Sequence, residues 1–338
     1  RRFVPPLRIV FCGTPAFAVP ALRELIARPE FKIEGVVTQP DRPRGRGGEI
    51  SFSPVKAEAL AAGIPVYQPA KIRGEEAFEY FARVAPDVVV IIAYGQIIPA
   101  RLIALPRLGW VNLHGSLLPK YRGAAPIHWA IAKGETQTGL TTMSIDAGLD
   151  TGPTLLRWET AIGPDETAPE LYARMAEAGG PLMVSSLRGL ADGTITPVAQ
   201  DGTKATLAPP LKKEDARIDW GLPAGVIYNR MRGFQPWPGA FTLFRGKLCG
   251  IWGKPSVGAS ALIGATVGAG LRPAPTAERD ARAMVPGTIR VADGDVLVAC
   301  GEGSVLRLES VQMEGRKRVA TREFVNGARI VDGERFGS

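Results

Sequence analysis

Residues 111–119 read VNLHGSLLP, and this stretch decides how the rest of the chain is interpreted. A strand-like apolar run leads into it, and a turn rich in Ser, Pro and Gly follows. Asn112 and His114 therefore stand where a buried strand reaches the surface, which is where open α/β sheets build their sites. Because side chains alternate along an extended segment, the two residues share one face.

A carboxylate follows in a second Gly-rich turn, residues 146–152, which reads DAGLDTG and contains Asp150. An imidazole moves protons near neutral pH, and a carboxylate orients it and raises its basicity. An Asn amide donates to a developing oxyanion. A histidine near a strand end is more often structural than catalytic. Together, however, Asn112, His114 and Asp150 suit acyl transfer without a covalent intermediate.

Strand-like and helix-like segments alternate over the first part of the chain. Strands are predicted at 7–12, 32–38, 64–67, 87–93, 109–114, 138–145 and 154–160. Helices are predicted at 18–27, 54–62, 75–83, 126–132 and 168–191, the last one broken at Gly179-Gly180. This alternation predicts an α/β fold with a Rossmann-like, mostly parallel sheet covered by helices on both sides.

The pattern changes after the last of these helices. Residues 195–210 are polar and Pro-rich, which predicts a linker between a first domain at 1–194 and a second at 211–335. In the second domain a helix is predicted at 219–234, with short strands at 240–244, 247–254, 287–292, 296–299 and 305–313. Short strands separated by turns indicate a small β-barrel. Residues 256–286 are rich in Ala, Gly and Pro and are predicted to form a long loop.

Charge points to an anionic partner. The net charge is +8, and residues from 206 onward carry 19 Lys and Arg against 13 Asp and Glu, compared with 22 against 20 before them. A plain solvated surface explains such a bias about as often as an anionic partner does, and nucleic acid is the more specific of the two interpretations. The three cysteines are far apart, which indicates a reducing compartment. Residues 1–6 are too short and Pro-rich for a signal peptide, and no apolar stretch would span a membrane, so a cytoplasmic protein is expected. The bacterial cytosol is the preferred expectation, and an organelle matrix remains open.

Several other kinds of site are disfavoured. The turn after the first strand lacks GxGxxG spacing, and neither GxxxxGK[ST] nor GxSxG occurs. His114 and His128 are 14 residues apart without HExxH, so no metal is expected. A calcium loop beginning at Asp146 would end on Arg157 rather than Glu.

The motifs resemble the 10-formyltetrahydrofolate-dependent formyltransferases and, within them, the members that act on methionine-charged initiator tRNA. Besides residues 112–119 and 146–152, the resemblance rests on FCGTP at 11–15, QPDRP at 39–43, SPVK at 53–56, AYG at 93–95, RGAAP at 122–126 and GFQPWPG at 233–239. It covers nearly the whole chain. It implies a catalytic first domain and an OB-like second domain that holds the tRNA.

The resemblance also implies roles for individual residues. Asn112, His114 and Asp150 match the catalytic set, and Asp150 is expected to keep His114 in its working tautomer. The folate-binding loop matches Ser116, Leu117, Leu118 and Pro119. A loop that enters the tRNA acceptor stem matches Arg42, Arg44 and Arg46. The co-substrate is then 10-formyltetrahydrofolate, the partner is methionine-charged initiator tRNA, and the protein is expected to be a monomer.

Other interpretations remain open. A sugar-nucleotide amine N-formyltransferase shares the Asn/His/Asp set, and the basic second half argues against it. A noncatalytic RNA-binding module gives no reason for the complete set. Lys212, Lys213, Arg230, Arg232, Arg245 and residues 316–318 are further candidates for phosphate contact, each more often plain surface. His128 is expected to be structural, and Trp237 to pack between its prolines rather than stack on a base.

Overall fold

The computed structural model describes residues 5–44, 49–256, 281, 284–292 and 294–337. The chain forms two compact units. Unit 1 consists of residues 1–127, 137–162 and 169–210, and unit 2 of residues 128–136, 163–168 and 211–338. Most of the predicted loop at 256–286 therefore lies outside the described residues. Within the described part, no helix is long and apolar enough to cross a membrane.

Unit 1 is built on a seven-stranded sheet with the order β5-β2-β1-β6-β7-β8-β9. Its strands are β1 (Leu7–Gly13), β2 (Phe31–Val37), β5 (Val66–Tyr67), β6 (Val88–Ile92), β7 (Trp110–His114), β8 (Gln137–Ser144) and β9 (Thr154–Ala161). The first five in this order pair in parallel, and β8 and β9 pair antiparallel. The chain reverses its direction of travel across the sheet between β1 and β6. Such a switch point opens a crevice at the carboxyl ends of the strands.

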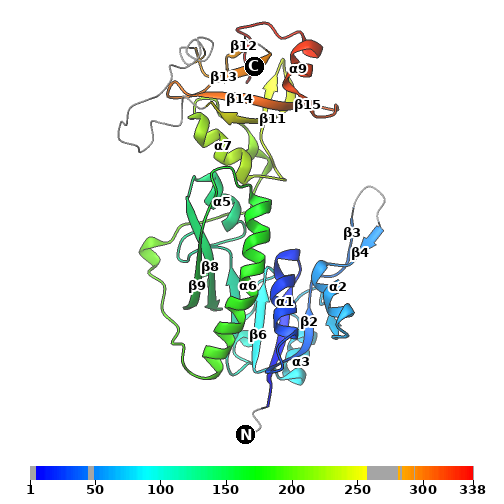
Figure 1. Ribbon diagram of the computed structural model, residues 1–338. Helices are drawn as coiled ribbons and strands as arrows, with labels where there is room; N and C mark the ends of the chain where they lie inside the picture. Colours follow the sequence, from blue (N-terminus) through cyan, green and yellow to red (C-terminus); the bar gives the residue numbers. More distant parts are fainter. Residues whose placement is uncertain (1–4, 45–48, 257–280, 282–283, 293, 338) are drawn as a thin grey trace. The chain divides into compact units, whose positions relative to one another are not determined.

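Helices lie between successive strands of this sheet, and one more follows β9 (Figure 1). They are η1 (Ala16–Ala18), α1 (Val19–Ile26), α2 (Pro54–Ala61), α3 (Glu75–Val84), α4 (Ala100–Ile103), α5 (Pro126–Ala132) and α6 (Ala168–Ala191). The predicted start of α2 is confirmed: Ser53 accepts a hydrogen bond from the Lys56 amide, and Pro54 occupies the first turn. A short hairpin of β3 (Arg42–Arg44) and β4 (Glu49–Ser51) precedes that helix.

Helix α6 is continuous, so the predicted break at Gly179-Gly180 is wrong. A Cβ on Gly179 would lie 2.5 Å from the Leu113 side chain, and one on Gly180 would lie 3.0 Å from Glu24. The two glycines allow α6 to pack closely against β7 and α1, and this packing outweighs their poor helix propensity of roughly 1 kcal/mol each. The helix thereby supports the strand that carries His114.

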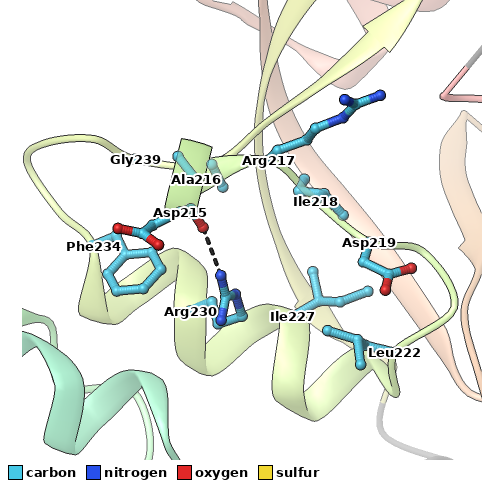
Figure 2. Close-up of a pocket in the computed structure, with 11 residues that line it drawn as sticks. Asp215, Ala216, Arg217, Ile218, Asp219, Leu222, Ile227, Arg230, Phe234 and Gly239 are labelled. Carbon is cyan, nitrogen blue, oxygen red and sulfur yellow. Dashed lines mark hydrogen bonds between the residues drawn. The ribbon is translucent and has the colours of Figure 1, made fainter. Parts of the chain in front are cut away.

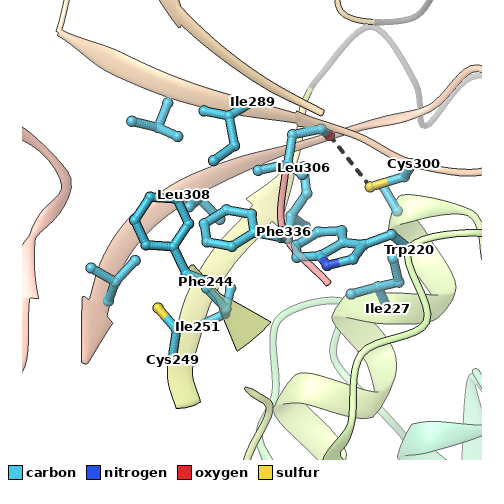
Figure 3. Packing of buried hydrophobic residues seen from close by; sticks show 14 of the residues in the cluster. Trp220, Ile227, Phe244, Cys249, Ile251, Ile289, Cys300, Leu306, Leu308 and Phe336 are labelled. Carbon is cyan, nitrogen blue, oxygen red and sulfur yellow. Dashed lines mark hydrogen bonds between the residues drawn. The ribbon is translucent and has the colours of Figure 1, made fainter. Parts of the chain in front are cut away.

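Unit 2 contains an antiparallel sheet with the order β10-β11-β14-β13-β12, and β15 pairs with β14. The elements are η3 (Lys213–Ala216), α7 (Ala224–Gly233), β10 (Phe241–Phe244), β11 (Lys247–Pro255), β12 (Ile289–Ala292), β13 (Asp295–Ala299), β14 (Val305–Met313), β15 (Val319–Ala320) and α9 (Thr321–Ala328). Figure 3 shows its core, where Trp220 stacks on Phe336 and Phe336 contacts Phe244. Helix α7 begins at residue 224 rather than at the predicted 219, because a residue before proline disfavours helix and Pro223 stands there.

The predicted fold class is confirmed. A Rossmann-like, mostly parallel α/β unit is followed by a smaller antiparallel β unit. The cysteines at 12, 249 and 300 are buried and free. Residues 195–210, predicted as a linker, belong to unit 1, where η2 (Gly202–Lys204) forms and residues 206–208 exchange backbone hydrogen bonds with residues 122–125.

Replacing Gly139 of β8 by Ala is expected to destabilise unit 1. The new Cβ would lie 1.9 Å from the Trp158 carbonyl oxygen and 2.6 Å from the Leu117 side chain, so the strand pair must shift. Forced overpacking of this kind costs about 1–3 kcal/mol, which lowers the melting temperature by several degrees in thermal unfolding. Gly202→Ala is the matched control, because nothing lies within 4 Å of that Cβ. Equal melting temperatures for the two variants would contradict this account of the β8–β9 contact.

Candidate active site at the end of β7

Asn112 and His114 lie at the carboxyl end of β7, at 9% and 6% exposure. Neighbouring strands hold them on both sides: Asn112 is in register with Ile91 of β6 and Met143 of β8, and His114 with Thr141. The alternation predicted from sequence therefore holds, and the two side chains share one face. Their position is the edge of the sheet where the carboxyl ends of β1, β2 and β6 also meet.

The His114 imidazole has a different partner at each nitrogen. Its Nε2 lies 2.8 Å from the backbone carbonyl oxygen of Tyr121, and its Nδ1 lies 3.6 Å from Oδ2 of Asp150. A carbonyl oxygen only accepts, so the first contact requires the proton on Nε2. The separation of 3.6 Å is too long for a hydrogen bond. Tyr121, rather than Asp150, therefore sets the tautomer in this geometry and leaves Nδ1 available beside a carboxylate.

Asp150 is held by its own turn. Its φ of 51° is left-handed, and its Oδ2 accepts a hydrogen bond of 2.8 Å from the Gly123 amide. Asp146 supports the same turn by accepting from the Gly148 amide and the Thr151 hydroxyl. The carboxylate is thus fixed from the backbone of one loop while facing the imidazole on β7. The structure brings together all three members of the predicted set.

The Asn112 carboxamide makes no hydrogen bond to any other residue that the structure describes. The two N–H donors of a buried side-chain amide are usually hydrogen-bonded to protein partners. Its donors are therefore available to a bound molecule at the strand end.

The loop predicted to bind folate is rigidly supported. The Ser116 hydroxyl donates to the Lys120 carbonyl, so it is committed within the loop. Thr141 donates to the Ser116 carbonyl and accepts from the Leu118 amide, and Arg157 donates to the Leu118 carbonyl. Ser116 and Leu118 are buried, whereas Leu117 and Pro119 are partly exposed. The latter two side chains are therefore the ones that solvent reaches.

A cleft of about 540 Å³ lies at the same edge of the sheet, where β1, β2 and β6 end. Its lining is mainly polar and includes Thr14, Gln39, Asp41, Arg42, Ser53 and Gln96. The Lys56 ammonium and the Gln68 amide hydrogen-bond Asp41 and hold the pKa of its carboxyl below the usual range. This volume falls within the range of small-molecule sites, roughly 300–1,000 Å³.

Of the arginines predicted to contact tRNA, Arg42 lines this cleft and is exposed. Arg44 ends strand β3, and Arg46 lies outside the described residues. The β3–β4 hairpin therefore carries at least one cation to the rim of the cleft.

Several cations in unit 2 are committed to internal contacts. Arg232 is 5% exposed and donates to the carbonyls of Gly163 and Glu166, so its assignment as a phosphate contact is wrong. Arg230 donates to the Asp215 carbonyl, and Arg245 pairs with Glu334. Arg245 is exposed in spite of this pair, as are the candidates Lys212, Lys213 and residues 316–318. Trp237 is 57% exposed, so the expectation that it packs between its prolines is also wrong.

Figure 2 shows a second cavity, in unit 2, between α7 and the segment around Ala216. Its volume is about 10 Å³, which is the space of roughly one water molecule. It is too small for a substrate. Within the described part of the chain, no group of three or more His, Cys, Asp or Glu side chains could hold a metal ion. His128 is half-buried on α5, and burial lowers its pKa.

Three contacts of this site had no signal in the sequence. The Tyr121 partner of His114 is a backbone carbonyl, which any residue type provides. Thr141 is one of many threonines in strands. Gln200 donates to the carbonyls of Asp150 and Gly152 from the segment predicted to be a linker.

Comparisons with known proteins identify the family of the chain. A family model described as formyl transferase matches residues 7–187, and one described as formyl transferase, C-terminal domain, matches residues 210–329. A curated protein named methionyl-tRNA formyltransferase from Solibacter usitatus is 51% identical over 98% of this chain and 99% of its own length. One of the same name from Acidobacterium capsulatum is 49% identical over 98% of this chain and 100% of its own length.

Among solved structures, an N-formyltransferase from Helicobacter canadensis in complex with folinic acid and dTDP-3-aminofucose has a TM-score of 0.62. The alignment covers 91% of this chain and 99% of the Helicobacter chain at 16% identity, which shows a likeness of fold. Both family models match in order over most of the sequence, and close relatives align from end to end. The chain belongs to the formyl transferase family.

Proposed function

We propose that this enzyme transfers the formyl group of 10-formyltetrahydrofolate to the α-amine of methionine on charged initiator tRNA. The observation that carries the proposal is His114 held between the Tyr121 carbonyl and the Asp150 carboxylate. The Asn112 amide, which has no hydrogen-bond partner among the described residues, lies on the same face. The names of the relatives support the substrate, since two proteins about half identical to this chain are called methionyl-tRNA formyltransferases.

The reaction forms one bond and breaks one. The neutral amine nitrogen of methionine attacks the formyl carbon, and the carbonyl oxygen takes the negative charge. The amine then gives up a proton, the bond from that carbon to folate N10 breaks, and N10 receives a proton. The products are the formylated amine and tetrahydrofolate, and no oxidant or metal enters the balance.

His114 and Asp150 would handle the proton. Nδ1 of His114 is left without a proton by the Nε2 contact, so it is the nitrogen that accepts one from the amine. Once protonated, the ring faces Oδ2 of Asp150 at 3.6 Å as an ion pair, which stabilises the imidazolium until the proton passes to N10. The same pair then serves as base and acid in turn.

Asn112 would donate to the oxyanion. The donor is preorganised because strands on both sides fix β7, and at 9% exposure little water competes for the same position. Leu117 and Pro119 would pack on the folate, while Ser116 and Leu118 hold the shape of the loop.

The acceptor end of the tRNA would enter from the side of the β3–β4 hairpin. Arg42 at the rim of the 540 Å³ cleft supports this direction. Initiator tRNA acts in translation, so we place the enzyme in the bacterial cytoplasm. We also expect the active form to be a monomer.

His114→Ala and Asn112→Ala are expected to lose most of the activity. Loss of the general acid–base group typically lowers the rate by about 10²–10⁴-fold, and loss of an oxyanion donor by about 10²–10³-fold. Single-turnover formyl transfer to charged tRNA measures both. His128→Gln is the matched control and should stay within about twofold of wild type, because that ring lies outside the site. Near-normal turnover in the Asn112 variant would remove its oxyanion role.

Arg42→Ala is expected to raise KM for charged tRNA without changing KM for the folate. The slope of log(kcat/KM) against log[salt] should also become shallower by roughly one unit, as for the loss of one phosphate contact. Arg73→Ala, a second exposed arginine of unit 1, serves as the control. Parallel salt slopes for Arg42→Ala and wild type would indicate a plain solvated turn.

The acceptor class is tested directly by offering charged initiator tRNA, uncharged tRNA and a 4-amino sugar nucleotide with the same formyl donor. Transfer to charged tRNA alone is expected, because the reactive amine is that of the methionine. Transfer to the amino sugar instead would retain the chemistry and replace the proposed acceptor.

A further inference from the structure

Gln200 connects three segments that are far apart in the sequence. Its Nε2 donates to the carbonyl oxygens of Asp150 at 2.8 Å and Gly152 at 2.7 Å. Its Oε1 accepts from Nε and Nη2 of Arg122 at 3.2 and 2.8 Å. We refer to Gln200 with these three partners as the Gln200 bridge. Both donors of the amide and its acceptor are used, so nothing is left for a substrate.

One end of the bridge fixes the turn that carries the Asp150 carboxylate. The left-handed backbone of Asp150 is sparsely populated by residues other than glycine and persists only where the surroundings enforce it. The two donated hydrogen bonds lie on either side of residue 151 and orient both peptide planes of the turn. The direction of the Asp150 side chain toward His114 follows from that orientation.

The other end fixes the peptide that faces Nε2 of His114. Arg122 is held through its backbone as well: its amide donates to the Thr206 carbonyl at 2.8 Å, and its carbonyl accepts from the Ala208 amide at 2.7 Å. The Tyr121 amide donates to the Thr206 hydroxyl at 2.8 Å. The segment from Gln200 to Ala208 therefore holds the Asp150 carboxylate and the Tyr121 carbonyl, the two groups on opposite sides of the imidazole.

We propose that Gln200 is a positioning residue for formyl transfer: it sets the distance between Asp150 and His114 without touching either substrate. This inference rests on the proposed function of the Asn112, His114 and Asp150 set. Misplacement of a catalytic group by about 1 Å costs up to roughly 10²-fold in rate. Loss of the bridge should therefore appear in kcat and leave substrate binding nearly unchanged.

Two variants distinguish a role of Gln200 in positioning Asp150 from a role that only attaches residue 200 to Arg122. Gln200→Glu keeps the size and the oxygen that binds Arg122, but it replaces the amide donor by an oxygen that faces two carbonyls. Gln200→Met keeps the length and removes both functions. Thr203→Ala is the matched control from the same segment, since its hydroxyl donates to neighbouring Asp201 and to no other residue that the structure describes. kcat, the KM for each substrate and the melting temperature are measured for all three, beside His114→Ala.

We expect both Gln200 variants to lower kcat by about 10- to 100-fold, to change either KM by less than about threefold, and to stay folded, with Thr203→Ala near wild type. Normal kcat in Gln200→Glu would overturn the inference, because the attachment to Arg122 would then suffice. So would losses confined to melting temperature or KM. Full activity in His114→Ala would overturn the proposed chemistry and this inference with it. A slow His114→Ala beside normal Gln200 variants would overturn the inference alone.

Discussion

The hydrogen bond between Nε2 of His114 and the Tyr121 carbonyl is the constraint on which the rest of the site depends. It places the single proton of the neutral ring on the nitrogen away from Asp150, and it makes Nδ1 the reactive position. His114 and Tyr121 are only seven positions apart in the sequence, yet the backbone between them does not by itself hold the contact in place. Tyr121 has a φ of 60°, a strained value for a bulky residue, and its amide is held by Thr206 from a distant segment.

The loop between β7 and α5 is a buried polar network rather than a flexible connection. The fully buried Thr141 hydroxyl makes two of the network's hydrogen bonds: it donates to the Ser116 carbonyl and accepts from the Leu118 amide. Satisfied networks of this kind specify a single geometry, because breaking any member leaves a buried polar group without a partner. The loop can therefore present Leu117 and Pro119 to a ligand while the histidine beside it keeps its orientation.

The sequence predicts the parts of the site that depend on residue type. The alternation of Asn112 and His114 on a strand end and the capping of α2 by Ser53 follow from local rules, and the structure agrees with both. The contacts that orient the imidazole could not be predicted, because they depend on backbone atoms, which every residue type provides. They also depend on Gln200, which lies about 50 positions after Asp150 in a polar stretch typical of linkers. The continuity of α6 through Gly179 was also missed, because close packing against Leu113 outweighs helix propensity.

The tautomer of His114 tests this account most directly. The chain has two histidines, so long-range ¹H–¹⁵N spectra of the imidazoles, assigned with a His128→Gln variant, report each ring separately. The measurement is made at a pH where the ring is neutral. We expect a proton on Nε2 of His114 and an unprotonated Nδ1. A proton on Nδ1 would mean that the ring donates toward Asp150, and the proton path proposed for formyl transfer would then be contradicted.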